Sequence, residues 1–159
     1  MTAGFAIRPA LPEDHASVAR ELVAYLGFIG AALDAEGLDY DIAHWQEEYD
    51  GRTGILLLVA DPAGDVVGTA AVRLLEPGLG EIKRMWLRPS LQGRGLGRRL
   101  MDACLDAARG LGCRSLRLDT QARLEAAVRL YRAYGFREIP RYNDNRRADI
   151  WMERSLPRP

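Results

Sequence analysis

The spacing of hydrophobic and polar residues predicts short strands and amphipathic helices along the chain. Residues 5–8 precede Pro9 and form a predicted strand, since the residue before proline favours an extended backbone. From Pro12 to Gly27 apolar residues recur every three or four positions, which predicts a helix with one apolar face. Residues 39–49 repeat this pattern over a shorter length, so a second helix is expected there.

Three successive strands are predicted in the middle of the chain. Short apolar segments alternate with turns that contain Pro and Gly, at residues 55–60, 66–75 and 80–87. Strands with such short connections pair with their neighbours in sequence, so these three should be antiparallel.

The next segment predicts a strand–helix–strand unit. A glycine loop over residues 92–97 leads into an amphipathic helix that closes at Gly112. Residues 115–119 form the following strand, which should run parallel to the strand at 80–87, because such units nearly always cross over in that sense.

The chain closes with one more helix and two strands. The helix stops at Gly135, and strands are expected at residues 136–141 and 149–156, joined by a polar loop and followed by a short tail. No repeat, low-complexity segment or linker divides the chain, so a single domain over residues 1–159 is predicted, with its core at about 5–156.

Charge and composition exclude several classes of protein. Lys and Arg together number 22, as do Asp and Glu, so the general positive charge expected of a nucleic-acid-binding protein is absent. No apolar run approaches the roughly 20 residues that span a bilayer, and a cytoplasmic protein without membrane contact is expected. Cys104 and Cys113 should be reduced and packed in the core. His15 and His44 lack the spacing of metal ligands, so no metal is expected.

The glycine loop carries the strongest chemical signal. Gly93, Gly95 and Gly97 leave backbone N–H groups unhindered at the positive end of a helix, a geometry that binds phosphate, and Arg94 and Arg98 add charge. A dinucleotide fingerprint would need glycine in place of Arg98, and a P-loop would need Gly-Lys-Ser/Thr. A turn that merely starts a helix is the simpler alternative, but it accounts for one glycine better than for three.

Two motifs stand on either side of the helix that follows this loop. The first is Glu81-Ile-Lys-Arg-Met-Trp-Leu-Arg-Pro89 followed by Gln92-Gly-Arg-Gly-Leu-Gly97, and it resembles the Gln/Arg-x-x-Gly-x-Gly/Ala motif of the GNAT superfamily of N-acetyltransferases. The second, Ala127-Val-Arg-Leu-Tyr-Arg-Ala-Tyr-Gly-Phe136, is similar to that family's Leu-Tyr-x-x-x-Gly-Phe segment. The resemblance covers about residues 5–156.

The resemblance implies the GNAT fold and an acetyl-CoA co-substrate. This fold is α/β, of the α+β type: a mixed, mostly antiparallel twisted sheet of about six to seven strands, with helices on both faces and splayed central parallel strands. The implied cofactor-binding residues lie at the end of a strand and in the loop: Met85, Trp86, Leu87, Gln92, Gly93, Arg94, Gly95, Leu96, Gly97 and Arg98. The Trp86 side chain itself is expected to be a core aromatic.

One position departs from the family pattern. Many members carry Asn seven residues before the tyrosine of the second motif, and this chain has Leu124 there. The far end of the cofactor would then be held differently, and the candidates for this role are Thr120, Gln121 and Arg123.

Acetyl transfer to an amine needs a base, an oxyanion donor and an acid for the leaving thiolate. Tyr131 matches the tyrosine that protonates the sulfur in many family members; its alternative role is core packing, for which Tyr134 is better placed. Glu81 stands where several members keep a general base, and it is equally well explained as a surface or salt-bridging carboxylate. A backbone N–H near Leu87 would meet the oxyanion.

The acceptor region follows from the resemblance as residues 25–45 and 142–147. Within it, an acidic cluster would either attract a cationic amine or, more simply, form a solvated loop: Asp34, Glu36, Asp39 and Asp41.

The leading interpretation is an enzyme that moves acetyl from acetyl-CoA to a primary amine of a small molecule or peptide, by direct attack in a ternary complex. Two alternatives are a catalytically weak CoA-binding regulatory or interaction module of the same fold, suggested by Leu124 and the uncertain base, and a different acyl donor. Exposed strand edges in a small domain favour a homodimer.

Overall fold

A mixed sheet of seven strands forms the centre of the computed structural model, which describes residues 2–158. The strands are β1 (Ala6–Pro9), β2 (Gly54–Ala60), β3 (Val66–Glu76), β4 (Leu79–Leu87), β5 (Ser115–Thr120), β6 (Arg137–Ile139) and β7 (Ile150–Ser155). Their order is β1-β2-β3-β4-β5-β7-β6, and only β4 and β5 are parallel. The predicted mixed, mostly antiparallel sheet is confirmed. The predicted domain begins at Met1 and its tail ends at Pro159, and both of these residues lie outside the described ones.

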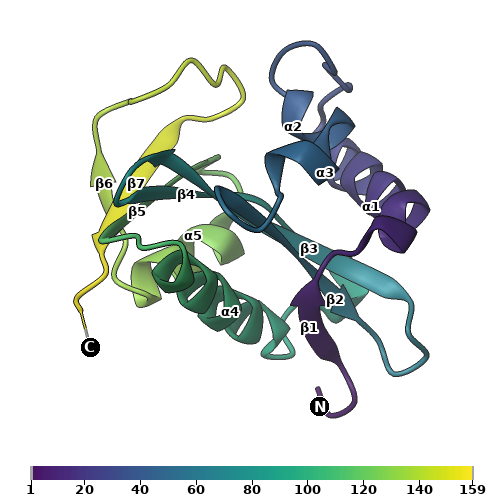
Figure 1. Ribbon diagram of the computed structural model, residues 1–159. Coiled ribbons are helices and arrows are strands. Elements are labelled where there is room, and N and C mark those ends of the chain that lie inside the picture. Colours follow the sequence, from purple (N-terminus) through teal and green to yellow (C-terminus); the bar gives the residue numbers. More distant parts are fainter. Residues whose placement is uncertain (1, 159) are drawn as a thin grey trace.

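Helices cover both faces of the sheet, as predicted (Figure 1). They are α1 (His15–Phe28), α2 (Tyr40–Ala43), α3 (Trp45–Glu48), α4 (Leu96–Gly110) and α5 (Glu125–Ala133), with 3-10 turns at Pro12–Asp14 and Pro89–Leu91. The first three helices lie on one side of the sheet, and α4 and α5 lie on the other.

The core consists of two hydrophobic clusters, one on each face of the sheet. Along β2, Leu56 and Leu58 pack with the apolar face of α1, while Leu57 and Val59 belong to the cluster that contains the apolar face of α4. Because both faces are covered, this strand is continuously apolar instead of alternating.

Both cysteines are free and buried, which confirms the packing role predicted for them. Burial raises the pKa of the Cys104 thiol to about 12. Between residues 2 and 158, no helix is long and apolar enough to cross a bilayer. The same part of the chain contains no group of three His, Cys, Asp or Glu side chains that could hold a metal ion.

Two predicted elements differ from those observed. The single helix expected at 39–49 is divided into α2 and α3, because the backbone of His44 leaves the helical region. A segment this short has little helical stability of its own, so packing decides its backbone. The strand expected at 136–141 ends at Ile139, since Pro140 cannot donate a ladder hydrogen bond.

The two parallel strands separate soon after they begin. Pairing of β4 with β5 runs only from Leu79 to Glu81, and β5 then continues alongside β7 as far as Thr120. Next to the separation, β4 bulges opposite β3, and Arg84 takes a φ of 57°. The Thr69 hydroxyl donates to the Arg84 carbonyl at 2.7 Å and stabilises this bulge. The predicted splay is therefore present, and it opens the sheet beside α4.

Candidate active site

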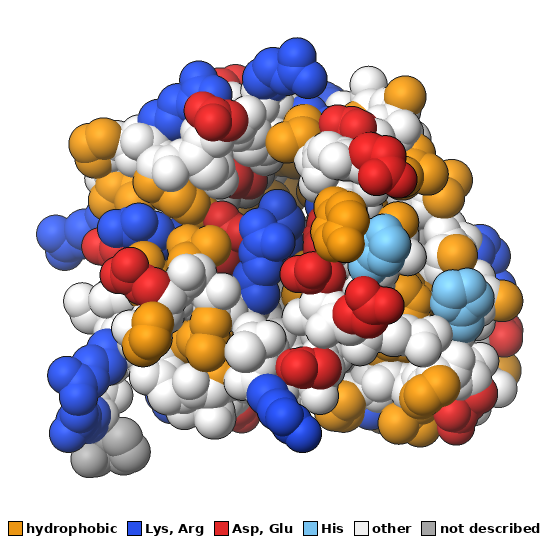
Figure 2. Space-filling view, turned by 45° about the horizontal axis from the view of Figure 1, so that its top comes forward, with side chains coloured by type: hydrophobic (Ala, Val, Ile, Leu, Met, Phe, Trp, Pro, Cys, Tyr) orange, Lys and Arg blue, Asp and Glu red, His pale blue; other side chains and the backbone are white. Residues whose placement is uncertain are grey.

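A cavity of about 830 Å³ lies where β4 and β5 separate. Its walls come from the second half of β4, the start of α4, the end of β5, α5, α1 and the loop before β7. Figure 2 views the molecule towards the loops that border this cavity and shows basic side chains at the centre of the face, with acidic ones on both sides.

The glycine loop forms one end of the cavity and presents free backbone donors. Gly93 and Gly95 have φ values of 76° and 85°, and Gly95 caps the N-terminus of the 15-residue helix α4. Within residues 2–158, the backbone N–H groups of residues 93–98 donate no hydrogen bond. The Gln92 side chain donates to the Leu87 carbonyl at 3.0 Å and ties the loop to β4. This loop therefore offers a run of N–H groups at the positive end of a helix, as an anion site requires.

Most of the predicted cofactor-binding residues line the cavity: Met85, Trp86, Leu87, Gln92, Gly93, Gly95, Gly97 and Arg98. Arg94 is exposed outside the lining, and Leu96 is a fully buried core residue that is also absent from the lining. Trp86 is 6% exposed and its ring lies 5.3 Å from that of Phe28, so the predicted aromatic packing is confirmed.

Tyr131 lies on α5, lines the cavity and is 6% exposed. Its ring packs edge-on against Phe136 at 6.2 Å, so it contributes to the core as well. No hydrogen bond among the described residues uses its hydroxyl. Burial raises the pKa of this hydroxyl, which is therefore a neutral donor at physiological pH.

Tyr134 packs against the core only as a partly buried residue, so the prediction that it is better placed there than Tyr131 is wrong. It is less buried than Tyr131, and its hydroxyl donates to Asp102 Oδ1 at 2.8 Å and to the Arg98 carbonyl at 3.1 Å. The two tyrosines are three residues apart, and the Tyr134 hydroxyl lies at the surface of α4, where it contacts Arg98 and Asp102.

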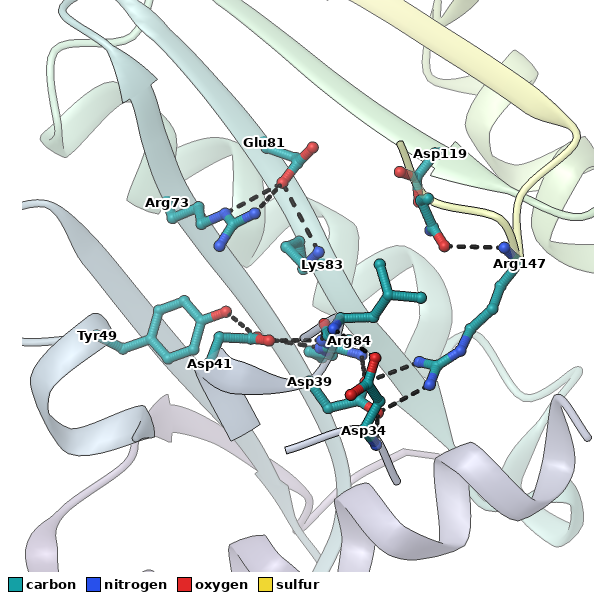
Figure 3. Close-up of polar contacts among 12 residues, drawn as sticks. Asp34, Asp39, Asp41, Tyr49, Arg73, Glu81, Lys83, Arg84, Asp119 and Arg147 are labelled. Carbon is teal, nitrogen blue, oxygen red and sulfur yellow. Dashed lines mark hydrogen bonds and ion pairs between the residues drawn. The ribbon is translucent and has the colours of Figure 1, made fainter. Parts of the chain in front are cut away.

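Glu81 is 2% exposed and does not line the cavity. Its carboxylate accepts a hydrogen bond from the Tyr142 hydroxyl at 2.6 Å. It also pairs with Arg73 at 3.1 Å, and Lys83 Nζ lies 4.0 Å away (Figure 3). These contacts match the salt-bridging alternative. The role of Glu81 as a general base stays a prediction.

The acidic cluster is not a solvated loop, because two of its members are buried ion-pair partners. Asp39 accepts from Arg84 at 3.1 Å and from Arg147 at 2.7 Å, and Asp41 accepts from Arg84 and from Tyr49. Burial opposes ionisation of both carboxyls, yet the neighbouring guanidinium groups hold the pKa of each below its ordinary value. Figure 3 shows Arg147 reaching from the loop before β7 to Asp39, which joins the two regions predicted to flank the acceptor.

Several lining residues were not singled out from the sequence. Arg84, Lys83 and Arg147 line the cavity beside Tyr25 and Asp119. The alternation of Glu81 and Lys83 on one face of a strand was the available signal for Lys83, but nothing in the sequence shows the bulge that turns Arg84. Leu124 lines the cavity, and so do the three residues predicted to contact the cofactor in place of the absent Asn: Thr120, Gln121 and Arg123.

Comparison with known proteins relates this geometry to a family. The model of the acetyltransferase (GNAT) family matches residues 17–136. A protein of Schizosaccharomyces pombe, named as an uncharacterised N-acetyltransferase, is 33% identical over 136 residues, which are 85% of this chain and 83% of that protein.

Two solved structures share the fold. A GNAT-family acetyltransferase of Staphylococcus aureus Mu50 superposes with a TM-score of 0.86 at 17% identity, covering 96% of this chain and 99% of that one. The PaiA N-acetyltransferase of Thermoplasma acidophilum, solved in complex with coenzyme A, gives a TM-score of 0.76 at 15% identity over 96% of this chain and 99% of that one.

Proposed function

This chain belongs to the GNAT family of acetyltransferases, and we propose that it transfers the acetyl group of acetyl-CoA to a primary amine of a small molecule or peptide by direct attack in a ternary complex. Family membership makes it an acetyl-CoA-dependent N-acetyltransferase; the acceptor class and the direct attack are the proposal. One observation carries the proposal: the glycine loop, with its free N–H groups, and Tyr131 line the same cavity.

The residues of the cavity fit acetyl-CoA. The loop N–H groups and the Arg98 side chain would hold the pyrophosphate, because backbone donors and positive charge converge there. Beyond Glu81 the edge of β4 has no strand partner on the β5 side, so the backbone of residues 85–87, apart from the Leu87 carbonyl that Gln92 engages, is available to the pantetheine arm. This open edge also brings the thioester into the gap between the strands.

Tyr131 would supply the proton that the reaction requires. When the amine nitrogen bonds to the thioester carbon, the C–S bond breaks, the thiolate takes the proton of Tyr131, and the nitrogen gives one proton to water. The raised pKa of Tyr131 keeps its proton in place until the thiolate forms. The same dry surroundings raise the basicity of the thiolate, so the two groups are matched.

Replacing Tyr131 tests this role. A screen of acyl-CoA donors against primary amines, followed by thiol release and by the mass of the products, identifies the substrates. With them, Tyr131→Phe should lower kcat by about 10²- to 10⁴-fold, the range for a lost general acid, with the Kd for acetyl-CoA unchanged.

Tyr134→Phe is the matched control, because it removes a hydroxyl from the residue that follows α5, outside the cavity lining. It should leave kcat within about twofold. Equal rates for wild type and Tyr131→Phe would refute the acid role. Binding of acetyl-CoA without turnover of any amine would favour the catalytically weak module instead.

A further inference from the structure

Most charged side chains at the acceptor end of the cavity are already paired within the protein. Arg84 donates to Asp41, to Asp39 and to the Leu38 carbonyl. Arg147 donates to both oxygens of Asp39 and to the Ala32 carbonyl. Arg84 thus has its Nε and both terminal nitrogens engaged, and Arg147 has both of its terminal nitrogens engaged, so neither guanidinium requires an anion from a substrate.

Lys83 is different, because it lines the cavity while its ammonium has only a long ion pair with Glu81 and no hydrogen-bond acceptor among the described residues. Its side chain is 17% exposed, and its Nζ lies 4.0 Å from Glu81 Oε1, beyond hydrogen-bond distance. No hydrogen bond between residues 2 and 158 uses this ammonium, and Glu81 is already engaged by Arg73 and Tyr142. Burial lowers the pKa of Lys83, as expected for a cation with too little compensation.

Asp119 provides the opposite charge on the facing strand. It lies on β5, lines the cavity and accepts amide hydrogen bonds from Asn143 at 2.6 Å and from Asn145 at 3.1 Å. Across the described chain it forms no ion pair. Figure 3 shows Lys83 on β4 and Asp119 on β5, on the two sides of the gap where these strands separate.

We propose that Lys83 and Asp119 bind the two ends of a small zwitterion, so that the acceptor is a primary amine that also carries a carboxylate, such as a free amino acid. Lys83 receives the carboxylate, and Asp119 holds the ammonium in the gap. The ammonium gives one proton to water, and the neutral amine then attacks the thioester carbon. This inference rests on the proposed function, since it names the acceptor of the same reaction.

Other acceptors fit the charges less well. A polyamine would satisfy Asp119 but place a second cation near Lys83, and like charges repel. The N-terminus of a peptide has no carboxylate beside its amine, so the Lys83 ammonium would keep only its 4.0 Å ion pair with Glu81 and would still lack a hydrogen-bond acceptor. A zwitterion leaves neither charge uncompensated, which is the arrangement that a largely buried site favours.

Matched pairs of acceptors test the proposal directly. Each standard L-amino acid is compared with its own primary amide, which keeps the amine and side chain and removes only the negative charge. Initial rates of thiol release from acetyl-CoA should favour the acid of the productive pair by about 10- to 100-fold in kcat/KM, mainly through KM, as expected for one charged hydrogen bond.

Variants of both residues assign the effect. Lys83→Met should bring the acid-to-amide ratio close to one, whereas Lys83→Arg, which keeps the charge, should retain most of the preference. Asp119→Asn should raise KM for acid and amide alike. Calorimetric titration with coenzyme A checks that each variant is folded and keeps its cofactor site.

The outcomes separate this inference from the proposed function. Acetylation of amides or peptide N-termini at rates equal to or above those of the acids overturns the zwitterion and leaves the acetyltransferase standing. A preference for acids that survives Lys83→Met overturns the assignment of Lys83. Coenzyme A binding without thiol release for any amine overturns the proposed function, and the inference falls with it.

Discussion

Arg84 links the backbone of the sheet to the charges around the cavity. It is a non-glycine residue with a φ of 57°, in a backbone region that residues other than glycine rarely adopt. The bulge there turns its side chain towards Asp39 and Asp41, which lie on the segment after α1. The ion pairs therefore offset the strain of the bulge, and the bulge in turn shapes the open edge of β4.

Removing one partner of this buried cluster should destabilise the protein strongly. Asp41→Asn removes one of the two carboxylates that pair with the buried Arg84 guanidinium, and this loss should lower the free energy of unfolding by about 3 kcal/mol. Urea unfolding measures this loss. Asp106→Asn, which removes an exposed carboxylate paired with Arg109, is the control and should stay within about 0.5 kcal/mol of wild type. Equal effects would contradict the buried role.

The same carboxyls set the response of stability to acid. The pKa values of Asp39 and Asp41 are lowered in the folded protein, whereas in the unfolded chain an Asp has a pKa of about 3.9. Their stabilisation is fully present above the unfolded value and is lost as the pH falls through the lower folded values. Urea unfolding should therefore give a level free energy down to about pH 5 and a decline below about pH 4 that is shallower in Asp41→Asn.

At the scale of elements, the proposed anion site depends on the way α4 begins. Its apolar face packs in the core through fully buried residues such as Leu100 and Cys104, so the helix is rigid. Its first residues follow Gly95, whose positive φ lets the chain enter the helix without a side chain over the free N–H groups.

Gly95→Ala tests the loop as an anion site. A Cβ at this φ costs about 1–2 kcal/mol of stability and changes the direction of the free N–H groups, so the Kd for acetyl-CoA should rise about tenfold or more. Gly64→Ala is the matched control, because Gly64 has a φ of 92° and equally open space but lies in the β2–β3 turn. It should cost similar stability and leave the Kd unchanged. An equal rise in Kd in both variants would show that backbone strain alone weakens binding, and it would contradict the anion site.

The elements and their order were predictable from the sequence, but their partners were not. Periodicity shows which face of α1 or α4 is apolar, and glycines and prolines mark where the elements end. Periodicity does not identify what a charged residue meets across the fold. The Arg84–Asp41 contact spans 43 residues and the Tyr142–Glu81 contact spans 61, so an acidic loop could not be told from a buried ion-pair cluster.

At the scale of the whole molecule, the sheet is divided into two halves between β4 and β5. β1 to β4 form an antiparallel half with α1 on one face and α4 on the other, and β5, β7 and β6 form the second half. The short parallel contact of β4 and β5 holds the halves together, and the cavity opens where it ends. Direct transfer requires both substrates in this one gap at the same time.

Initial rates with acetyl-CoA and the acceptor varied together, combined with the mass of the enzyme after exposure to acetyl-CoA alone, test this central claim most directly. Direct attack predicts intersecting double-reciprocal lines and an enzyme of unchanged mass. Parallel lines, together with an acetylated enzyme that passes its acetyl group to the amine, would contradict it.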